Sequence, residues 1–150
     1  MMPEIFTIGY ARSTQDALIA ALQAARVEVL ADIRALPNSR RPGFSKTSLT
    51  AAVEAGGMEY IHIRELGTPK EGREAARRGD MNKLQAVYEQ QLLTPEAAAR
   101  MLELQELAMT RRTCLLCYCE ETAKCHRGLL CSHAFSAWRR IDLSPAPQNA

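Results

Sequence analysis

Thiols, an imidazole and a guanidinium group lie together in one short segment of this chain. Cys125, His126 and Arg127 are consecutive. Cys117 and Cys119 precede them by a few residues, at the end of an apolar, β-prone run. This run gives way to polar residues and then to a helical pattern, so the segment is predicted to be strand, turn and helix. A helix that begins near Cys125 directs unpaired backbone N–H groups and its positive dipole end into the turn.

The cysteine at this helix start is the first candidate for a reactive group. A helix N-terminus and a neighbouring guanidinium group both stabilise a thiolate, so Cys125 is predicted to have a lowered pKa and to be catalytic. Its alternative role is a small residue that tightens the turn. Arg127 and His126 are predicted to bind a ligand in the same turn, because helix N-termini bind anions. Glu120 and Tyr10 are the remaining candidates for proton transfer.

The other cysteines differ in the surroundings that the pattern predicts. Cys117 and Cys119 alternate along a strand and share one face, whereas Cys114 points to the opposite face. Cys114 and Cys131 are predicted to be core residues, because free cysteine is among the most buried residue types.

A zinc site is an alternative use of the cluster. The suitable side chains are Cys117, Cys119, Cys125 and His126 or His133. Structural zinc sites commonly use two compact ligand pairs on separate turns, and the sequence contains one crowded group instead. The spacing therefore predicts a reduced cluster with no metal and no cofactor.

Strands and helices are predicted to alternate along the chain. Four β-prone runs are present, at residues 5–8, 27–31, 58–63 and 114–119. Segments with helical spacing separate them. Ser13 with Asp16 has the pattern of a capping box, and Thr94 followed by Pro95 is a strong helix start. The charged segment 66–80 is predicted to be a loop.

This alternation predicts a single three-layer α/β domain over residues 1–141, followed by a disordered tail at 142–150. We expect a mostly parallel sheet of about four to five strands with helices on both faces, and the first strand between the second and the fourth. Ligands of such sheets bind beyond the carboxyl ends of the strands.

Three arginines are predicted to converge at this edge, namely Arg12, Arg34 and Arg127. Asp32 is predicted to orient one of them through a salt bridge. The ligand-binding candidates are Gly9, Arg12, Asp32, Arg34, Ser39, Arg40, His126 and Arg127. Guanidinium groups bind phosphate through paired hydrogen bonds, so the expected partner is a phosphate-bearing small molecule or a nucleic acid.

The chain resembles the domain of unknown function 488 family. The resemblance rests on four matches: Thr7-Ile8-Gly9-Tyr10 with Arg12; Asp32-Ile33-Arg34 with Pro37, Ser39-Arg40, Pro42 and Phe44; Leu66-Gly67; and Leu115-Leu116-Cys117 through Cys125-His126-Arg127. It implies a small α/β domain of bacteria and archaea without an established activity. The chain departs from the family at Cys119, where many members carry an acid, and Glu120 follows it.

Composition indicates the class of protein and the compartment in which we expect it. A net charge of +2, with 47% hydrophobic and 24% charged residues, indicates a globular domain and by itself favours neither nucleic acid nor membrane. An odd number of cysteines crowded together is not a disulfide framework. The start lacks a signal-peptide pattern, and no apolar run approaches ~20 residues, so we expect a cytoplasmic protein without membrane contact.

Together these patterns predict an arginine-lined anion site that binds a phosphate-bearing ligand. If the protein is an enzyme, its reactive group is predicted to be a cysteine or a glutamate. Two other classes stay open. One is a non-catalytic module that associates with nucleic acid, and the other is a thiol redox or metal-binding protein that uses Cys119 and Cys125.

Overall fold

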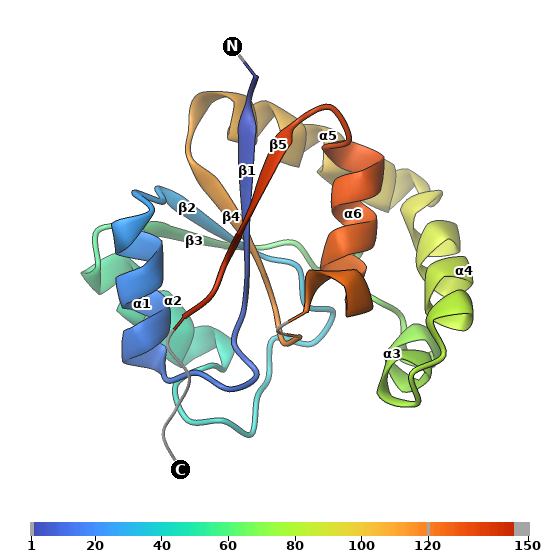
Figure 1. Cartoon of the computed structure of the whole chain (residues 1–150), viewed down its shortest axis with the longest axis horizontal. Helices are drawn as coiled ribbons and strands as arrows, with labels where there is room; N and C mark the ends of the chain where they lie inside the picture. Colours follow the sequence, from blue (N-terminus) through green and yellow to red (C-terminus); the bar gives the residue numbers. More distant parts are fainter. Residues whose placement is uncertain (1, 120, 146–150) are drawn as a thin grey trace.

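A sheet of five parallel strands is the centre of the computed structural model, which describes residues 2–119 and 121–145 (Figure 1). The strands are β1 (Glu4–Gly9), β2 (Val29–Asp32), β3 (Glu59–His62), β4 (Thr113–Cys117) and β5 (Arg139–Leu143). Their order across the sheet is β3-β2-β4-β1-β5. The central strands β4 and β1 are apolar and buried along nearly their whole length, because helices cover both faces of a parallel sheet.

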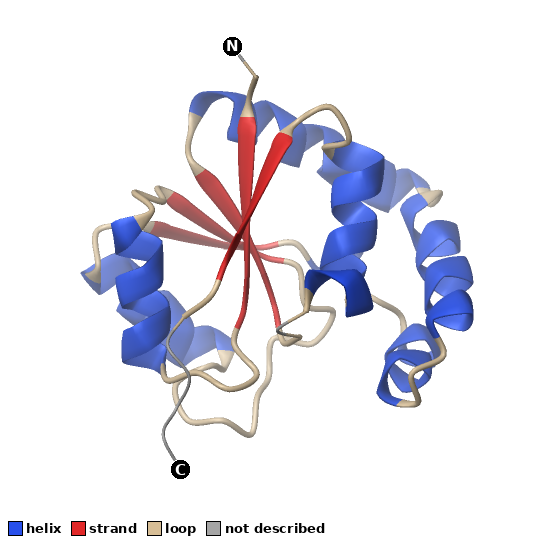
Figure 2. Ribbon diagram, viewed as in Figure 1, coloured by secondary structure: helices blue, strands red, loops and turns tan. Residues whose placement is uncertain are grey.

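Helices lie on both sides of the sheet (Figure 2). One face carries α1 (Gln15–Ala24) and α2 (Lys46–Ala55), and the other carries α4 (Met81–Leu92), α5 (Pro95–Thr110) and α6 (His126–Ala134). The short α3 (Lys70–Arg77) packs on α4. Single 3₁₀ turns occur at Arg64–Leu66 and Thr122–Lys124. The layers confirm the predicted three-layer α/β domain. Among the described residues, no helix has the length and apolar character needed to cross a membrane.

The strand order differs from the predicted one. The fourth strand lies between the first and the second, so β4 pairs with both β1 and β2. The chain leaves β1 and β2 toward α1 and α2 on one face, whereas it leaves β4 toward α6 on the other. At the carboxyl end of β4, the connection that follows this strand and those that follow its neighbours β1 and β2 therefore run to opposite faces of the sheet. Ligands of open α/β sheets bind at such points.

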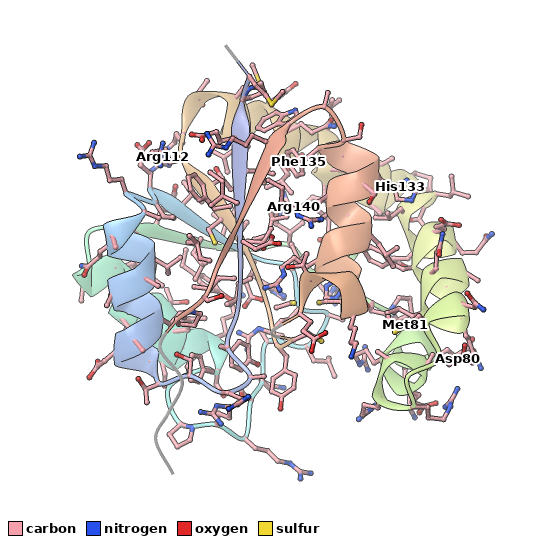
Figure 3. All side chains as sticks on the ribbon, viewed as in Figure 1. Asp80, Met81, Arg112, His133, Phe135 and Arg140 are labelled. Atoms are coloured by element: carbon pink, nitrogen blue, oxygen red, sulfur yellow. The ribbon has the colours of Figure 1, made fainter. Side chains whose placement is uncertain are left out.

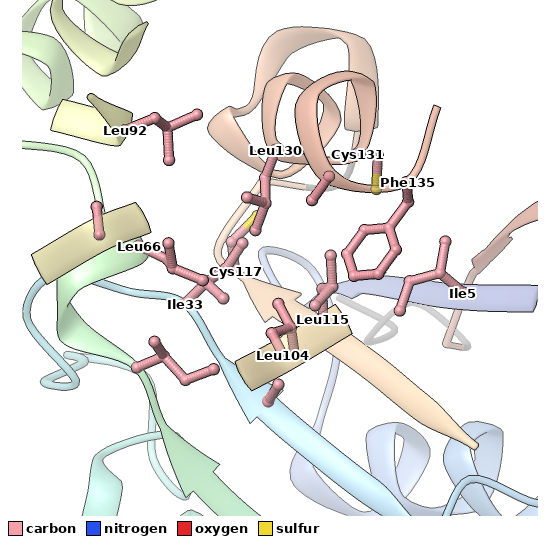
Figure 4. Close-up of a cluster of buried hydrophobic side chains, with 14 of the residues drawn as sticks. Ile5, Ile33, Leu66, Leu92, Leu104, Leu115, Cys117, Leu130, Cys131 and Phe135 are labelled. Carbon is pink, nitrogen blue, oxygen red and sulfur yellow. The ribbon is translucent and has the colours of Figure 1, made fainter. Parts of the chain in front are cut away.

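Two apolar cores flank the sheet. Successive side chains of β4 point to opposite faces. Leu115 and Cys117 pack toward α6 (Figure 4), while Cys114 and Leu116 pack toward α1 and α2. Cys114 is fully buried, as its pattern predicts. Cys131 on α6 is also buried, and its prediction as a core residue is confirmed.

Several local predictions are corrected. The strand β5 was not predicted, and it includes Asp142 and Leu143, which the sequence pattern assigned to the tail. Its side chains are mostly exposed, so it carries no apolar signal and depends on backbone pairing with β1. Residues 146–150 of the predicted tail lie outside the described part. The charged segment 66–80 contains the helix α3.

Of the two predicted helix starts, the first is corrected by one residue and the second is confirmed. Thr14, rather than Ser13, caps α1, and its hydroxyl accepts a hydrogen bond from the N–H of Ala17. Thr94 caps α5 with Pro95 in its first turn, as predicted.

Candidate functional site

The loop that follows β4 lies directly on the end of β1. The backbone N–H of Ala11 donates a 2.9 Å hydrogen bond to the carbonyl of Tyr118. A Cβ atom on Gly9 would lie 1.8 Å from the carbonyl oxygen of Cys119, so a side chain at position 9 is incompatible with this packing. Gly9 is thus a structural requirement for the position of the cysteine loop.

Cys117, Cys125 and His126 meet where β4 ends and α6 begins. The Sγ atoms of both cysteines and a ring nitrogen of His126 all lie within 4.8 Å of one another. Cys117 and Cys125 are buried, with 1% and 3% of their surface exposed. Cys125 occupies the N-cap position of α6, which confirms that the helix begins at this residue.

The imidazole of His126 has a defined tautomer. Its Nε2 lies 2.8 Å from the backbone carbonyl of Ile33, at the end of β2. A carbonyl oxygen only accepts hydrogen bonds, so Nε2 carries the hydrogen. In neutral His126 the lone pair of Nδ1 therefore faces the Sγ atom of Cys125 at 3.6 Å. Burial lowers the pKa of His126 and keeps the ring neutral, so the lone pair of Nδ1 is available to accept a hydrogen bond from the thiol of Cys125.

The cysteines differ in acidity. Burial disfavours the thiolate of Cys125, but hydrogen bonds from Cys117 and Cys119 and the charge of Arg127 outweigh it, and its pKa lies well below the ordinary value. Burial and the interactions with Cys119 and Cys125 raise the pKa of Cys117. The interaction with Cys117 lowers the pKa of Cys119, but the interaction with Cys125 and burial together outweigh it and raise the pKa to about 11. Cys125 is the thiol that ionises first.

Arg127 lies in the interior beneath this cluster. Only 1% of its surface is exposed, and its Nη2 donates a 3.1 Å hydrogen bond to the hydroxyl of Thr122. Its Nη1 lies close to Gly9, 3.1 Å from the place that a Cβ atom there would take. The arginine therefore places a positive charge between the ends of β1 and α6, next to the thiols.

A second group of polar side chains surrounds Arg34. Its guanidinium group contacts both carboxylate oxygens of Asp32 at 2.9 and 2.7 Å, so the predicted salt bridge is confirmed. It also donates to the hydroxyl of Tyr10 at 3.0 Å and to the carbonyl of Phe44 at 2.7 Å. Tyr10 stacks on Phe44, with ring centroids 4.5 Å apart. Asp32, Arg34 and Tyr10 thus form a buried network that joins the loops after β1 and β2.

The remaining predicted residues lie nearer the surface. Arg12 is exposed and lines a hollow of ≈ 50 Å³. Arg40 is exposed on the loop after β2. Ser39 shapes that loop, because its hydroxyl accepts from the N–H of Arg41 at 3.1 Å. Glu120 lies outside the described residues.

The three predicted arginines therefore occupy different environments, two buried and one exposed. Sequence reasoning named Cys117 only as an alternative zinc ligand, and it missed the carbonyl of Ile33 in the thiol site. The alternation of Cys117 with Cys119 was the signal for the first, and a backbone carbonyl gives none.

The thiol cluster also contains the donors that a metal requires. Within the part of the chain that the structure describes, Cys117, Cys125 and His126 form the group with suitable spacing. His133, the other histidine considered for zinc, lies on the side of α6 that faces α4 (Figure 3), with its Nε2 3.7 Å from Glu89. It is not part of the cluster.

Comparison with known proteins identifies the family of this chain. The family model "Domain of unknown function DUF488" matches residues 14–134, which is more than half of the chain. The protein belongs to this family, as its resemblance predicted. Neither the curated proteins nor the solved structures contain a match.

Proposed function

We propose that this domain is a thiol redox protein in which Cys125 is oxidised by a hydroperoxide and then forms a disulfide with Cys119. The observation that supports it best is the 3.6 Å contact between Cys125 Sγ and His126 Nδ1, whose tautomer is set by the hydrogen bond to Ile33. A thiol paired with an oriented base is the arrangement of an activated sulfur nucleophile.

The reaction balances without a cofactor. Nδ1 of His126 takes the proton of Cys125, and the thiolate attacks the peroxide oxygen. The O–O bond breaks, an alcohol or water leaves, and Cys125 becomes a sulfenic acid. The sulfur of Cys119 then attacks the sulfenic sulfur, and water leaves as the S–S bond forms. Two thiols lose two electrons in total, and one hydroperoxide gains them.

Cys119 is better placed than Cys117 to complete the disulfide. Cys117 belongs to β4, where it is paired with Gly9 of β1, and its side chain is buried. Cys119 lies beyond the end of β4, six residues before Cys125, and is partly exposed. Its backbone lies outside the strand pairing and its side chain is not enclosed in the core, so its sulfur can move toward Cys125 and a cellular reductant can reach it.

Thiol counting with peptide mapping tests this proposal. The reduced, chelator-treated full chain contains five thiols. One equivalent of hydrogen peroxide is expected to consume two of them and to link Cys119 to Cys125. Cys125→Ser should prevent this loss, whereas Cys131→Ser, a buried cysteine of α6, should behave as the parent. Equal thiol loss in Cys125→Ser, or a disulfide that involves Cys114 or Cys131, would overturn the proposal.

A second candidate function is the binding of a phosphate-bearing ligand, and the hollow beside Arg12 favours it. The residues that line it are Gly9, Arg12, Ser13, Leu143, Ser144 and Pro145. Its volume of ≈ 50 Å³ accommodates a small anionic group, and an exposed guanidinium group is a suitable partner for phosphate.

A phosphate titration of the thermal midpoint at constant ionic strength tests this second function. Phosphate at a hundred times its dissociation constant should stabilise the fold by about 2.7 kcal/mol. Arg12→Ala should weaken the effect, and Arg26→Ala, beyond the far end of α1, should leave it intact. The same phosphate response in Arg12→Ala and the parent would remove this hollow as the binding site.

A further inference from the structure

We infer that the reduced thiol cluster is a zinc site, with Cys117, Cys119, Cys125 and His126 as the four ligands. The inference rests on the proposed redox function, because it concerns the same thiols. It extends that function in two ways: the reduced thiols bind zinc, and their oxidation releases the zinc.

The separation of the donor atoms is the first argument. Zinc binds sulfur at about 2.3 Å and imidazole nitrogen at about 2.1 Å in tetrahedral geometry, which places two such ligands about 3.6 Å apart. The Sγ atom of Cys125 and Nδ1 of His126 are 3.6 Å apart. The Sγ atom of Cys117 lies within 4.8 Å of both donors. Cys119, two residues after Cys117 and partly exposed, lies outside this 4.8 Å group and supplies the fourth ligand of a Cys₃His set if its side chain turns toward the other donors.

The hydrogen bond of the histidine is the second argument. Metal-binding histidines commonly donate their other ring N–H to a carbonyl or carboxylate, which fixes the ring and its tautomer. His126 donates Nε2–H to the carbonyl of Ile33 at 2.8 Å and turns Nδ1 toward the thiols. The ring also packs edge-on against Tyr88 at 5.2 Å. The nitrogen donor is therefore held in place before a metal binds.

Charge and burial are consistent with this ligand set. Three thiolates and one Zn²⁺ have a net charge of −1, which is costly to bury without a nearby cation. Arg127 supplies a buried positive charge beside the cluster. Two sulfur donors are almost fully buried, as in closed structural zinc sites. The ligands do not form two compact pairs along the sequence, but the fold brings the end of β4 and the start of α6 together.

Metal release follows from the redox chemistry. A disulfide between Cys119 and Cys125 removes two thiolate ligands, and Cys117 and His126 alone hold zinc weakly. Oxidation by a hydroperoxide should therefore eject the metal from the site. Reduction should restore its affinity.

Zinc titration of the reduced, chelator-treated full chain tests the site. We expect about one Zn²⁺ per chain, and Co²⁺ in its place should give thiolate-to-cobalt charge-transfer absorption. Cys117→Ser should weaken zinc binding by more than the roughly 10–100-fold that loss of an outer hydrogen-bond partner costs. Cys131→Ser should bind as the parent does. His126→Gln provides a second variant, since its amide can still donate to Ile33, and circular dichroism reports whether each variant is folded.

The outcomes separate the two proposals. A parent that takes up no zinc but still forms the Cys119–Cys125 disulfide would overturn the metal site and leave the redox function standing. Equal zinc loss in folded Cys117→Ser and Cys131→Ser would also overturn the site. Zinc that binds but is not released by peroxide, with no disulfide formed, would overturn the redox function alone. Zinc released by peroxide, as followed with a metallochromic chelator, supports both.

Discussion

The Nε2–H group of His126 donates a 2.8 Å hydrogen bond to the backbone carbonyl of Ile33, a residue 93 positions earlier in the chain. This bond connects the first turn of α6 to the end of β2. It leaves Nδ1 as the acceptor that faces Cys125. Because the partner is a backbone carbonyl, the orientation of the base depends on the fold and on no particular side chain at position 33.

Replacing this base should slow oxidation of the thiol. His126→Phe keeps an aromatic ring next to Tyr88 but removes both ring nitrogens. In metal-free protein near neutral pH, the rate of thiol loss to hydrogen peroxide should fall on the order of 10²-fold, the usual contribution of a general base. His133→Gln, at an exposed position of the same helix, is the control. An unchanged rate in folded His126→Phe would exclude His126 as the base.

A side chain at Gly9 should disturb both the fold and the thiols. The new Cβ of Gly9→Ala meets the carbonyl of Cys119, which is backbone and yields only if the loop moves. We expect a loss of about 3 kcal/mol or more in the free energy of unfolding, together with slower disulfide formation.

Gly57→Ala is the matched control for this change. Gly57 has a φ of +84° with no atom within 4 Å of a new Cβ, so only backbone strain of about 1–2 kcal/mol is expected. Its disulfide formation should match that of the parent. Equal effects of the two variants on stability and on the thiols would contradict the close contact.

Removing the charge of Asp32 should be costly, because Arg34 is 6% exposed and would keep an unbalanced buried charge. Asp32→Asn is expected to lower the free energy of unfolding by about 3–5 kcal/mol, measured by urea denaturation. The exposed pair of Glu59 with Arg111 offers the comparison, and Glu59→Gln should cost less than about 1 kcal/mol. If Asp32→Asn and Glu59→Gln lowered the free energy of unfolding by similar amounts, burial of the Asp32–Arg34 pair would not affect its contribution to stability.

The hydroxyl of Tyr60 should stabilise the same network in a pH-dependent way. It donates a 2.5 Å hydrogen bond to Asp32, and burial together with that carboxylate raises its pKa above the ordinary value of 10.0. The folded state therefore holds this proton more tightly than the unfolded chain does. The contribution is complete below about pH 10 and is lost as pH rises through the folded pKa.

Tyr60→Phe measures this contribution. The variant should lose about 1.5–3 kcal/mol near neutral pH, the usual value for a hydrogen bond to a charged group. The difference from the parent should shrink between about pH 9 and about pH 11, because unfolded Tyr60 ionises there. Urea denaturation of both proteins at these two pH values measures the difference in the free energy of unfolding. A difference that grows with pH would contradict a raised pKa of Tyr60 in the folded state.

The local sequence pattern determined which side of the sheet the cysteines face and where two of the helices begin. Alternation along residues 114–119 predicted that Cys114 and Cys117 face opposite sides of the sheet, and both are buried as separate parts of the two cores. Helical signals placed the start of the last helix at Cys125 and of α5 after Thr94. These features depend on residue types and on spacing along the chain, so the sequence alone carries them.

Tertiary structure decided which groups meet. The order of the strands placed β4 between β1 and β2, which brings the carbonyl of Ile33 next to His126. The loop after β4 returns the chain so that Cys125 lies within 4.8 Å of Cys117. It also directed Arg34 into an internal ion pair with Asp32 while Arg12 stayed exposed. The strand β5 formed without an apolar pattern, because β1 offered an unpaired backbone edge. The contact of Ile33 with His126 and the pairing of β5 with β1 join atoms far apart in the sequence, and their partners are set by packing rather than by any local signal.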